Sequence, residues 1–227
     1  MNYLSAEKIG KSYHDKWLFQ NLNIGISQGE KMALVGENGT GKSTLLRMLN
    51  RIIIPDSGTI SFKNKPLSHF LVKRFGYLPE ERGLYRKMKA AEQVIFFAQL
   101  KGLSSAEALK QTRFWFERLE LDAAWNLKLE QLSKGMQQKV QFISTVVHNP
   151  ELLILDEPFS GFDPINAALI REEMLRLKGL GATIILSTHD MGSVEELCDE
   201  IGLIHQSNLI LSGPVKQVKN QFKQHLY

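Results

Sequence analysis

The segment with the clearest chemistry is GENGTGKST at residues 36–44. It contains the spacing G-x-x-x-x-G-K-S/T, directly after an apolar run and at the start of a helix-like stretch. Glycines here let successive backbone N–H groups turn toward phosphate oxygens, and a helix N-terminus adds positive potential. Lys42 would reach the β and γ phosphates of a nucleotide, and Ser43 would offer its hydroxyl to Mg²⁺. The predicted phosphate-binding residues are Gly36, Asn38, Gly39, Thr40, Gly41, Lys42, Ser43 and Thr44.

Two acidic residues follow a second apolar run, LLIL at residues 152–155. Four consecutive apolar residues predict a buried strand, and Asp156 and Glu157 stand at its carboxyl end, where parallel sheets bind their ligands. Asp156 would hold Mg²⁺, commonly through a water, and Glu157 would polarise the water that attacks the γ-phosphate. The phosphate loop alone leaves the reaction open, because kinases, GTPases and many ATPases share it.

The elements that must position these residues alternate between strand and helix. Residues 30–35 and 152–155 read as strands, and helical stretches follow at 42–49 and 164–177. A third strand at 183–186 precedes another helix at 191–198. Apolar strands alternating with helices predict an α/β fold in which helices cover both faces of a parallel sheet.

Three other parts of the chain follow different patterns. Residues 3–9, 22–26 and 59–62 are rich in β-formers with turn signals between them, which predicts an antiparallel β patch. The stretch from 88 to 148 favours helix almost throughout, which predicts an inserted helical subdomain with helices at 90–100, 106–119 and 134–147. Residues 201–211 predict two strands around a turn at 206–208, and a last helix follows Pro214.

Composition sets the broad class of the protein. The chain has 227 residues, 43% of them hydrophobic and 23% charged, which is ordinary globular usage. Its apolar runs fall far short of the roughly 18 residues that span a bilayer, so we expect no membrane crossing. Cys198 is its single cysteine, so no intrachain disulfide is possible, and a cytosolic location is expected. The net charge of +4 mildly favours anionic partners.

Taken together, these motifs make the chain resemble the ATP-binding subunit of an ABC transporter over nearly its whole length. The family's signature LSGGQ stands here as LSKGM at residues 132–136, and its loop SGFD stands at 160–163. The resemblance implies an ATPase with a P-loop NTPase (RecA-like) core that binds ATP and Mg²⁺. It implies one domain over residues 1–227, in which 1–84 and 150–227 form the catalytic core with the β patch and 85–149 form the helical subdomain.

The resemblance also implies roles for residues outside the phosphate loop. Ser133 and the N–H of Gly135 would hold the γ-phosphate of ATP bound to the other subunit of a head-to-tail dimer. Asp163 belongs to the implied dimer loop, and His189 in STHD would contact the γ-phosphate and join Lys42 and Glu157 in catalysis. Tyr13 stands where the family places an aromatic that stacks on adenine, although it could equally be an ordinary strand-end aromatic.

This sequence departs from the family pattern in three places. Lys134 replaces a glycine and Met136 a glutamine in the signature, and Glu80 replaces the glutamine of the family's Q-loop. A carboxylate adds charge beside Mg²⁺ and cannot donate as an amide does unless it is protonated. We expect Glu80 to sense the metal and to link it to the helical subdomain.

The implied partners are a second ATP-binding subunit and a separate integral-membrane permease, with no nucleic acid. PEERGLY at 79–85 together with LSKGM makes the chain most similar to multidrug-type or sodium-type exporter subunits, which places it at the inner face of the plasma membrane. Leu84, Tyr85 and Met88 lie where the family docks its membrane partner. Phe96 and Phe97 could line the same groove, but packing in the core is the favoured expectation for both.

Two alternative functions remain. A soluble ABC-type ATPase acting on ribosomes or nucleic acid would also suit a basic chain, but such proteins generally carry two cassettes or long coiled-coil insertions. A metabolic kinase or GTPase would share the phosphate loop but would not carry LSKGM before LLILDEP.

Overall fold

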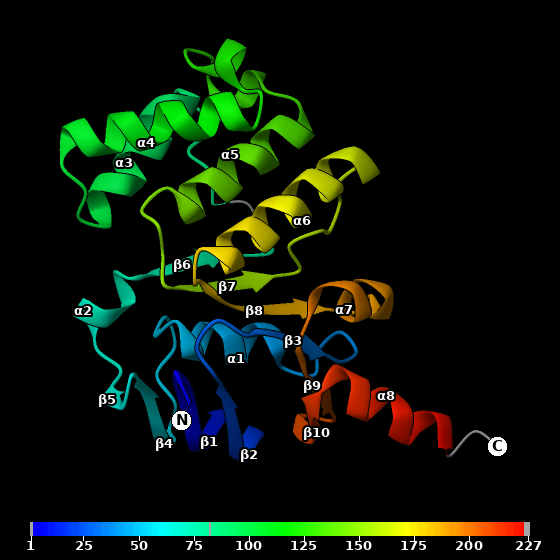
Figure 1. The fold of residues 1–227 in the computed structure, drawn as a ribbon. Helices are drawn as coiled ribbons and strands as arrows, with labels where there is room; N and C mark the ends of the chain where they lie inside the picture. Colours follow the sequence, from blue (N-terminus) through cyan, green and yellow to red (C-terminus); the bar gives the residue numbers. More distant parts are fainter. Residues whose placement is uncertain (1, 82, 225–227) are drawn as a thin grey trace.

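The computed structural model describes residues 2–81 and 83–224, and a six-stranded sheet forms its centre (Figure 1). The strand order is β10-β9-β3-β8-β7-β6, and every neighbouring pair is parallel except β9 with β10. The strands are β3 (Lys31–Val35), β6 (Phe75–Leu78), β7 (Leu152–Asp156), β8 (Thr183–Thr188), β9 (Glu200–His205) and β10 (Asn208–Pro214). The expected parallel sheet is therefore confirmed.

A second, antiparallel sheet has the strand order β2-β1-β4-β5. Its strands are β1 (Leu4–Tyr13), β2 (Lys16–Ile26), β4 (Ser57–Phe62) and β5 (Lys65–Pro66). The predicted β patch is present, but β1 and β2 extend well beyond the apolar segments that predicted them. Their polar ends pair with each other as a ribbon up to a turn at His14 and Asp15, so backbone pairing continues where hydrophobic patterning stops.

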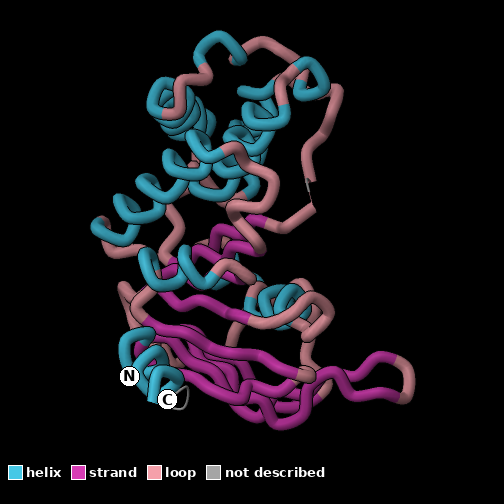
Figure 2. The backbone as a smooth tube through the Cα atoms, turned by 90° about the vertical axis from the view of Figure 1, so that its right-hand side faces the viewer, coloured by secondary structure: helices cyan, strands magenta, loops and turns pink. Residues whose placement is uncertain are grey.

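One end of the molecule consists of helices and loops, whereas the strands lie in the rest of it together with further helices (Figure 2). α3, α4 and α5 form the helical end, whereas α1 packs between the two sheets. The helices are α1 (Lys42–Leu49), α2 (His69–Val72), α3 (Ala90–Leu100), α4 (Ser105–Arg118), α5 (Lys134–Val146), α6 (Pro164–Gly179), α7 (Met191–Leu197) and α8 (Val215–Gln224). Two short 3₁₀ helices, Asp122–Ala124 and Leu129–Gln131, complete the connection from α4 to α5.

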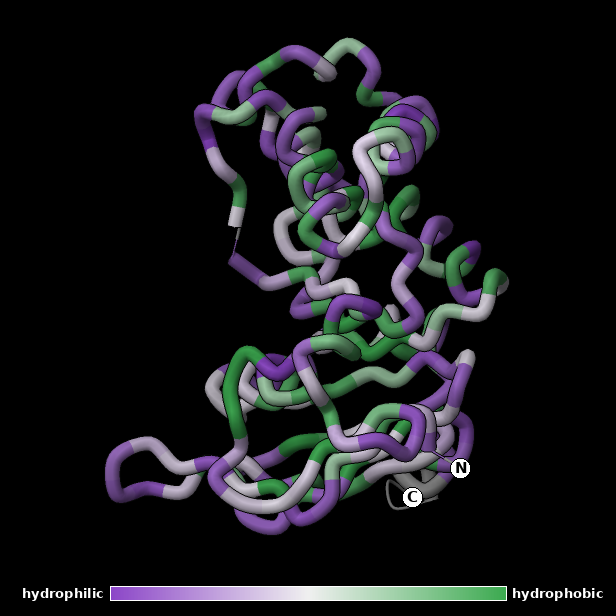
Figure 3. Tube along the Cα trace, turned by 90° about the vertical axis from the view of Figure 1, so that its left-hand side faces the viewer, coloured by the Kyte–Doolittle hydropathy of each residue, from purple (hydrophilic) through white to green (hydrophobic). Residues whose placement is uncertain are grey.

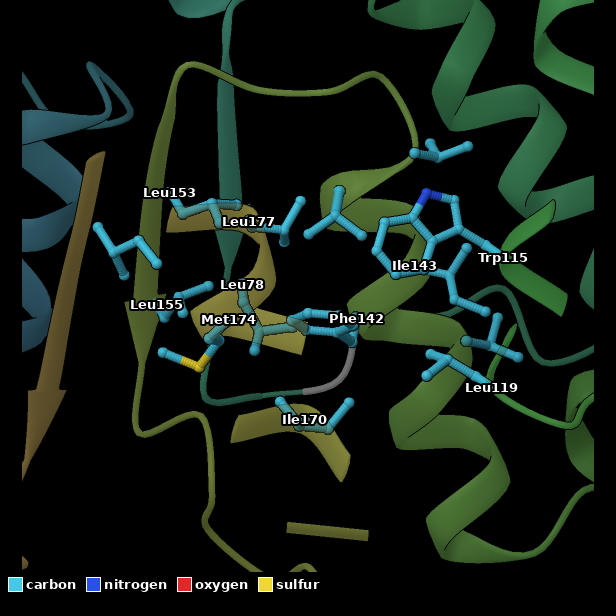
Figure 4. Close-up of a cluster of buried hydrophobic side chains, with 14 of the residues drawn as sticks. Leu78, Trp115, Leu119, Phe142, Ile143, Leu153, Leu155, Ile170, Met174 and Leu177 are labelled. Atoms are coloured by element: carbon cyan, nitrogen blue, oxygen red, sulfur yellow. The ribbon is translucent and has the colours of Figure 1, made fainter. Parts of the chain in front are cut away.

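The alternation of side chains along β7 divides the hydrophobic core in two. Leu152 and Ile154 face α1 and the antiparallel sheet, whereas Leu153 and Leu155 face the helices on the other side. Figure 4 shows Leu153 and Leu155 pointing toward side chains of α5 and α6, among them Phe142. Hydrophobic segments run through the interior and hydrophilic ones along the loops (Figure 3). A strand that is apolar on both faces thus anchors the acidic pair that follows it.

The sequence patterns missed β6, β5 and α2. β6 is only four residues, FGYL, too short for a periodic signal, and its place is set by pairing with β7. Gly76 in β6 is required by close packing, because a Cβ there would lie 2.4 Å from the backbone O of Thr145 in α5. Within the described residues, no helix is both long enough and apolar enough to cross a bilayer.

Candidate active site

The phosphate loop connects β3 to α1 and borders a cleft of about 260 Å³. The cleft is lined by Leu18, Asn38, Gly39, Gly41, Lys42, Ser43, Thr44, Glu80 and Glu157. Lys42 Nζ donates to the backbone oxygens of Gly36 at 2.7 Å and Glu37 at 3.0 Å, so its ammonium lies across the loop. Gly41 has φ +98°, and a Cβ there would lie 2.4 Å from the Phe19 ring, so only glycine fits at the start of α1.

Asp156 occupies the buried end of β7 and is reached by two hydroxyl groups. Ser43 Oγ donates to Asp156 Oδ1 at 3.1 Å, and Ser187 Oγ on β8 donates to the same oxygen at 2.6 Å. Asp156 is 1% exposed, and its other oxygen, Oδ2, has no hydrogen-bond partner among the described residues. A buried carboxylate oxygen without a donor, beside a serine hydroxyl, is a donor set that suits a hard cation such as Mg²⁺.

Glu157 turns out of the strand into the cleft with an unusual backbone conformation. Its φ of +47° lies in the left-handed region, which costs energy for a residue with a Cβ and is common at functional sites. Its N–H donates to Ser187 Oγ at 2.9 Å, and its Oε1 lies 3.1 Å from Nδ1 of His189. The Glu157 side chain is 11% exposed and His189 is 69% exposed, so the histidine covers the carboxylate from the solvent side.

Glu80 borders two cavities. It lines the cleft around Lys42 and also a neighbouring cleft of about 390 Å³ that contains Asp156 and Glu157. No three His, Cys, Asp or Glu side chains in the described part of the chain are grouped so that they could hold a metal ion together. Mg²⁺ would therefore take most of its ligands from nucleotide and water, as this ion commonly does.

The signature segment and the loop before α6 meet on the same chain. Ser133 caps α5 by accepting from the N–H of Met136 at 3.2 Å. Gly135 packs against α6 so closely that a Cβ would lie 2.7 Å from Asn166 Nδ2. Asp163 caps α6, and hydrogen bonds from the backbone and side chain of Asn166 lower the pKa of its carboxyl. Ser133, Gly135 and Asp163 do not line the cleft around Lys42.

Tyr13 stands apart from this cluster at the end of β1. Its side chain is 47% exposed and does not line the cleft, whereas Leu18 of β2 does. The Lys11 ammonium lies 5.8 Å from the centre of the tyrosine ring. Asp190 caps α7, the helix after His189, and hydrogen bonds from Ser193 and from backbone N–H groups lower the pKa of its carboxyl.

An apolar groove of about 310 Å³ opens beside α3, α5 and β6. It is lined by Gly76, Tyr77, Pro79, Gly83, Leu84, Phe97, Lys101, Gln141, Ser144 and Thr145. The expectation that Phe96 and Phe97 belong to the core is wrong, because Phe97 lines the groove and Phe96 is 37% exposed. Tyr85, itself 54% exposed, stacks on Phe97 with ring centres 6.2 Å apart, so an aromatic contact covers part of the Phe97 ring at the surface.

Sequence patterns alone missed two side chains of the site. Ser187 contacts both acidic residues, but a serine inside an apolar strand carries no motif. Gln141 on α5 donates to backbone oxygens on both sides of Glu80, and its only signal was a polar residue on the buried face of a helix. Both act through contacts between segments distant in the chain.

Comparison with known proteins agrees with this geometry. A family model described as ABC transporter matches residues 19–160. An uncharacterized ABC transporter ATP-binding protein of Bacillus subtilis (strain 168) is 42% identical over 219 residues, covering 96% of this chain and 74% of the relative. The Nod factor export ATP-binding protein I of Sinorhizobium fredii is 34% identical, covering 92% of this chain and 62% of the relative.

A solved structure gives the same result for the fold. A structure titled as the ATP-binding subunit of an ABC transporter superposes with a TM-score of 0.90 at 29% identity, covering 97% of this chain and 93% of the other. The fold of the chain is thus that of a solved ATP-binding subunit over nearly its whole length. The chain therefore belongs to the ABC transporter ATP-binding proteins and is an ATP-binding subunit with ATPase activity.

Proposed function

We propose that two copies of this subunit, or this subunit and a homologous one, close on ATP and drive export through a separate membrane permease. The pairing is supported by the separation, within one chain, of the residues of the phosphate cleft from those of the signature segment. Lys42, Ser43 and Glu157 line one cleft, whereas Ser133 and Gly135, at the start of α5, do not line it. A helix N-terminus suits an anion, so each chain would offer this end of α5 to the nucleotide of its partner.

The residues of this cleft would bind the phosphates of ATP and the Mg²⁺ ion. Lys42 would leave its loop carbonyls for the β and γ phosphates, while the backbone N–H groups of residues 36–44 cradle them. Ser43 and Asp156 would hold Mg²⁺ and Glu80 would act on it through water, and the ion supplies charge neutralisation on the phosphates.

The catalytic step would then rest on Glu157. Its carboxylate would accept a proton from the attacking water. His189 would position that carboxylate from the exposed side and would also contact the γ-phosphate. Tyr13 would contact adenine, and Asp163 would act at the dimer interface. We also propose that residues 85–149 move as one subdomain against the core formed by 1–84 and 150–227.

The apolar groove is the proposed contact with the permease. Leu84 and Phe97 offer apolar surface, and Lys101 adds a cation whose pKa burial lowers to about 8. An amphipathic segment of the membrane protein would fit such a groove.

The relative from S. fredii is named for export, which supports export as the direction of transport. The subunit would then work at the cytoplasmic face of the plasma membrane. The alternative of a soluble ATPase acting on ribosomes or nucleic acid is not favoured, because the matched relatives are named for transport.

Two substitutions test the proposed site. Lys42→Ala should reduce ATP hydrolysis by about 100-fold or more, because it removes the main cation of the phosphate site. Glu157→Gln should keep ATP binding but stop turnover, so that a stable dimer accumulates with ATP and Mg²⁺ and is seen by light scattering after gel filtration. A Glu157→Gln protein that stays monomeric at saturating ATP and Mg²⁺ would refute the pairing.

Export itself is tested by the membrane partner. Copurification of a polytopic membrane protein with the subunit should be lost when the groove is filled by Leu84→Arg, with ATP binding retained. If copurification survives that change, the docking site lies elsewhere.

A further inference from the structure

Helix α5 presents a polar stripe to the loops that follow β6 and β7. Its members recur at intervals of four, three and four residues, which places them on one helix face. They are Lys134, Gln138, Gln141 and Thr145. Gln138 Nε2 donates to the backbone O of Ser160 at 3.1 Å, so this face holds the loop before α6.

Gln141 makes the contact with the most direct bearing on the nucleotide site. Its Nε2 donates to the backbone oxygens of Pro79 at 3.2 Å and of Glu81 at 3.4 Å. These two acceptors flank Glu80 in the chain. A primary amide has two N–H donors on one nitrogen, so one side chain can hold both carbonyl groups. Because Gln141 is 8% exposed, water competes little with these bonds.

The position of Glu80 makes this contact relevant to catalysis. Glu80 lines the cleft around Lys42 and the cleft that contains Asp156 and Glu157, and Gln141 lines the second of these. In the described chain, the Glu80 carboxylate has no hydrogen bond that would orient it by itself, so its placement depends on the backbone that carries it.

We propose that Gln141 is a positioning residue that holds the Glu80 loop on α5 and so sets how tightly the nucleotide site retains its divalent cation. The inference rests on the proposed function, because it takes Glu80 to act on the metal. The acting group is Glu80, and Gln141 determines where it stands.

The test replaces Gln141 by methionine, which keeps the length and removes both donors. Two measurements are made on the purified chain: Mn²⁺ binding by electron paramagnetic resonance with ATP in a Glu157→Gln background, and hydrogen exchange of residues 76–84 without nucleotide. We expect Mn²⁺ affinity to fall by about fivefold, the factor that corresponds to one of the two lost hydrogen bonds, and exchange in this segment to accelerate. ATP affinity in EDTA should not change.

Gln137→Met is the matched control. Gln137 is the same residue type on the same helix, and its Nε2 also donates to two backbone oxygens, those of Leu129 and Leu132, each at 3.0 Å. The control should lose comparable thermal stability while keeping the Mn²⁺ affinity of the parent. If Gln141→Met fails to fold, Gln141→Leu replaces it, since leucine is uncharged and also lacks the donors.

Mn²⁺ binding by the Glu80 and Gln141 variants distinguishes a positioning role of Gln141 from a metal role of Glu80. If Glu80→Gln weakens Mn²⁺ binding but Gln141→Met does not, the positioning role is wrong and the proposed site stands. Equal losses in Gln141→Met and Gln137→Met would also overturn it, because the effect would then be general to the helix. If Glu80→Gln leaves Mn²⁺ binding unchanged, the inference falls together with the metal role of Glu80, while loss of turnover in Lys42→Ala would still support the ATPase site.

Discussion

Ser187→Ala removes a single buried oxygen that contacts both acidic residues of the site. Ser187 is 0% exposed, donates to Asp156 Oδ1 at 2.6 Å and accepts from the N–H of Glu157 at 2.9 Å. Alanine fits the space but satisfies neither partner. Asp156 then keeps only the donor Ser43, and the strained backbone of Glu157 loses the group that anchors its N–H.

The expected magnitude follows from these two contacts. A hydrogen bond to a charged group contributes about 1.5–3 kcal/mol, and a buried polar group left without a partner costs about 1–3 kcal/mol. Because Glu157 is only partly buried, its N–H can recover some solvation, so we expect a total loss of about 3 kcal/mol in the free energy of unfolding. If the two carboxylates also shift by a fraction of an ångström, ATP turnover should fall by roughly 10- to 100-fold.

Chemical denaturation and steady-state ATP hydrolysis measure the two effects separately. Thr183→Val is the control, because Thr183 lies at the other end of the same strand, is 0% exposed and accepts from the N–H of Gly29 at 2.9 Å. It should cost about 1 kcal/mol of stability and leave turnover unchanged. A Ser187→Ala protein with parental turnover would show that Ser187 does not position the acidic pair.

Three further outcomes test other parts of the fold. Burial lowers the pKa of His148 to about 4, so the folded chain holds the imidazole neutral. The free energy of unfolding should therefore be full above pH 6.5 and about 2 kcal/mol lower at pH 5, where the unfolded chain gains a proton. Denaturation at several pH values should show that His148→Phe abolishes this loss. Burial raises the pKa of the Cys198 thiol to about 12, so iodoacetamide at pH 8 should react about three orders of magnitude more slowly than with a free thiol, and equal rates would contradict that burial. Gly58→Ala should lower the free energy of unfolding by about 2 kcal/mol or more, since its Cβ would lie 2.3 Å from the backbone O of Lys8. Gly29→Ala, with a similar φ and open space around it, should lower it by about 1 kcal/mol. Equal losses in denaturation experiments would show that the contact with Lys8 does not matter.

The fold was predictable where a local pattern carries its own physical reason. The apolar run 152–155 predicted a buried strand, and the structure buries it on both faces. The stretch 88–148 predicted helices, and α3, α4 and α5 lie there with boundaries shifted by at most one residue. β6 was missed because four residues with a central glycine have no periodicity, and only pairing with β7 makes them a strand.

The candidate site divides in the same way. The phosphate loop and the acidic pair carry their chemistry in consecutive residues, so their spacing alone indicated them. Phe97 was assigned to the core because an apolar residue on a helix usually packs inside, but the described structure leaves it in a groove. Which face of α3 is covered depends on the segments packed beside it, and that cannot be counted along α3 itself.

The sequence by itself determined which chemical groups this protein can use: a glycine-rich loop with Lys42, an acidic pair after a buried strand, and a signature segment at a helix start. Only the tertiary structure decided which of them meet. Ser187 reaches Asp156 and Glu157, and Gln141 reaches the loop of Glu80, across separations of 30 to 62 residues. The physical reason is that periodicity reports the environment of one element, whereas a hydrogen bond between elements depends on the packing of both.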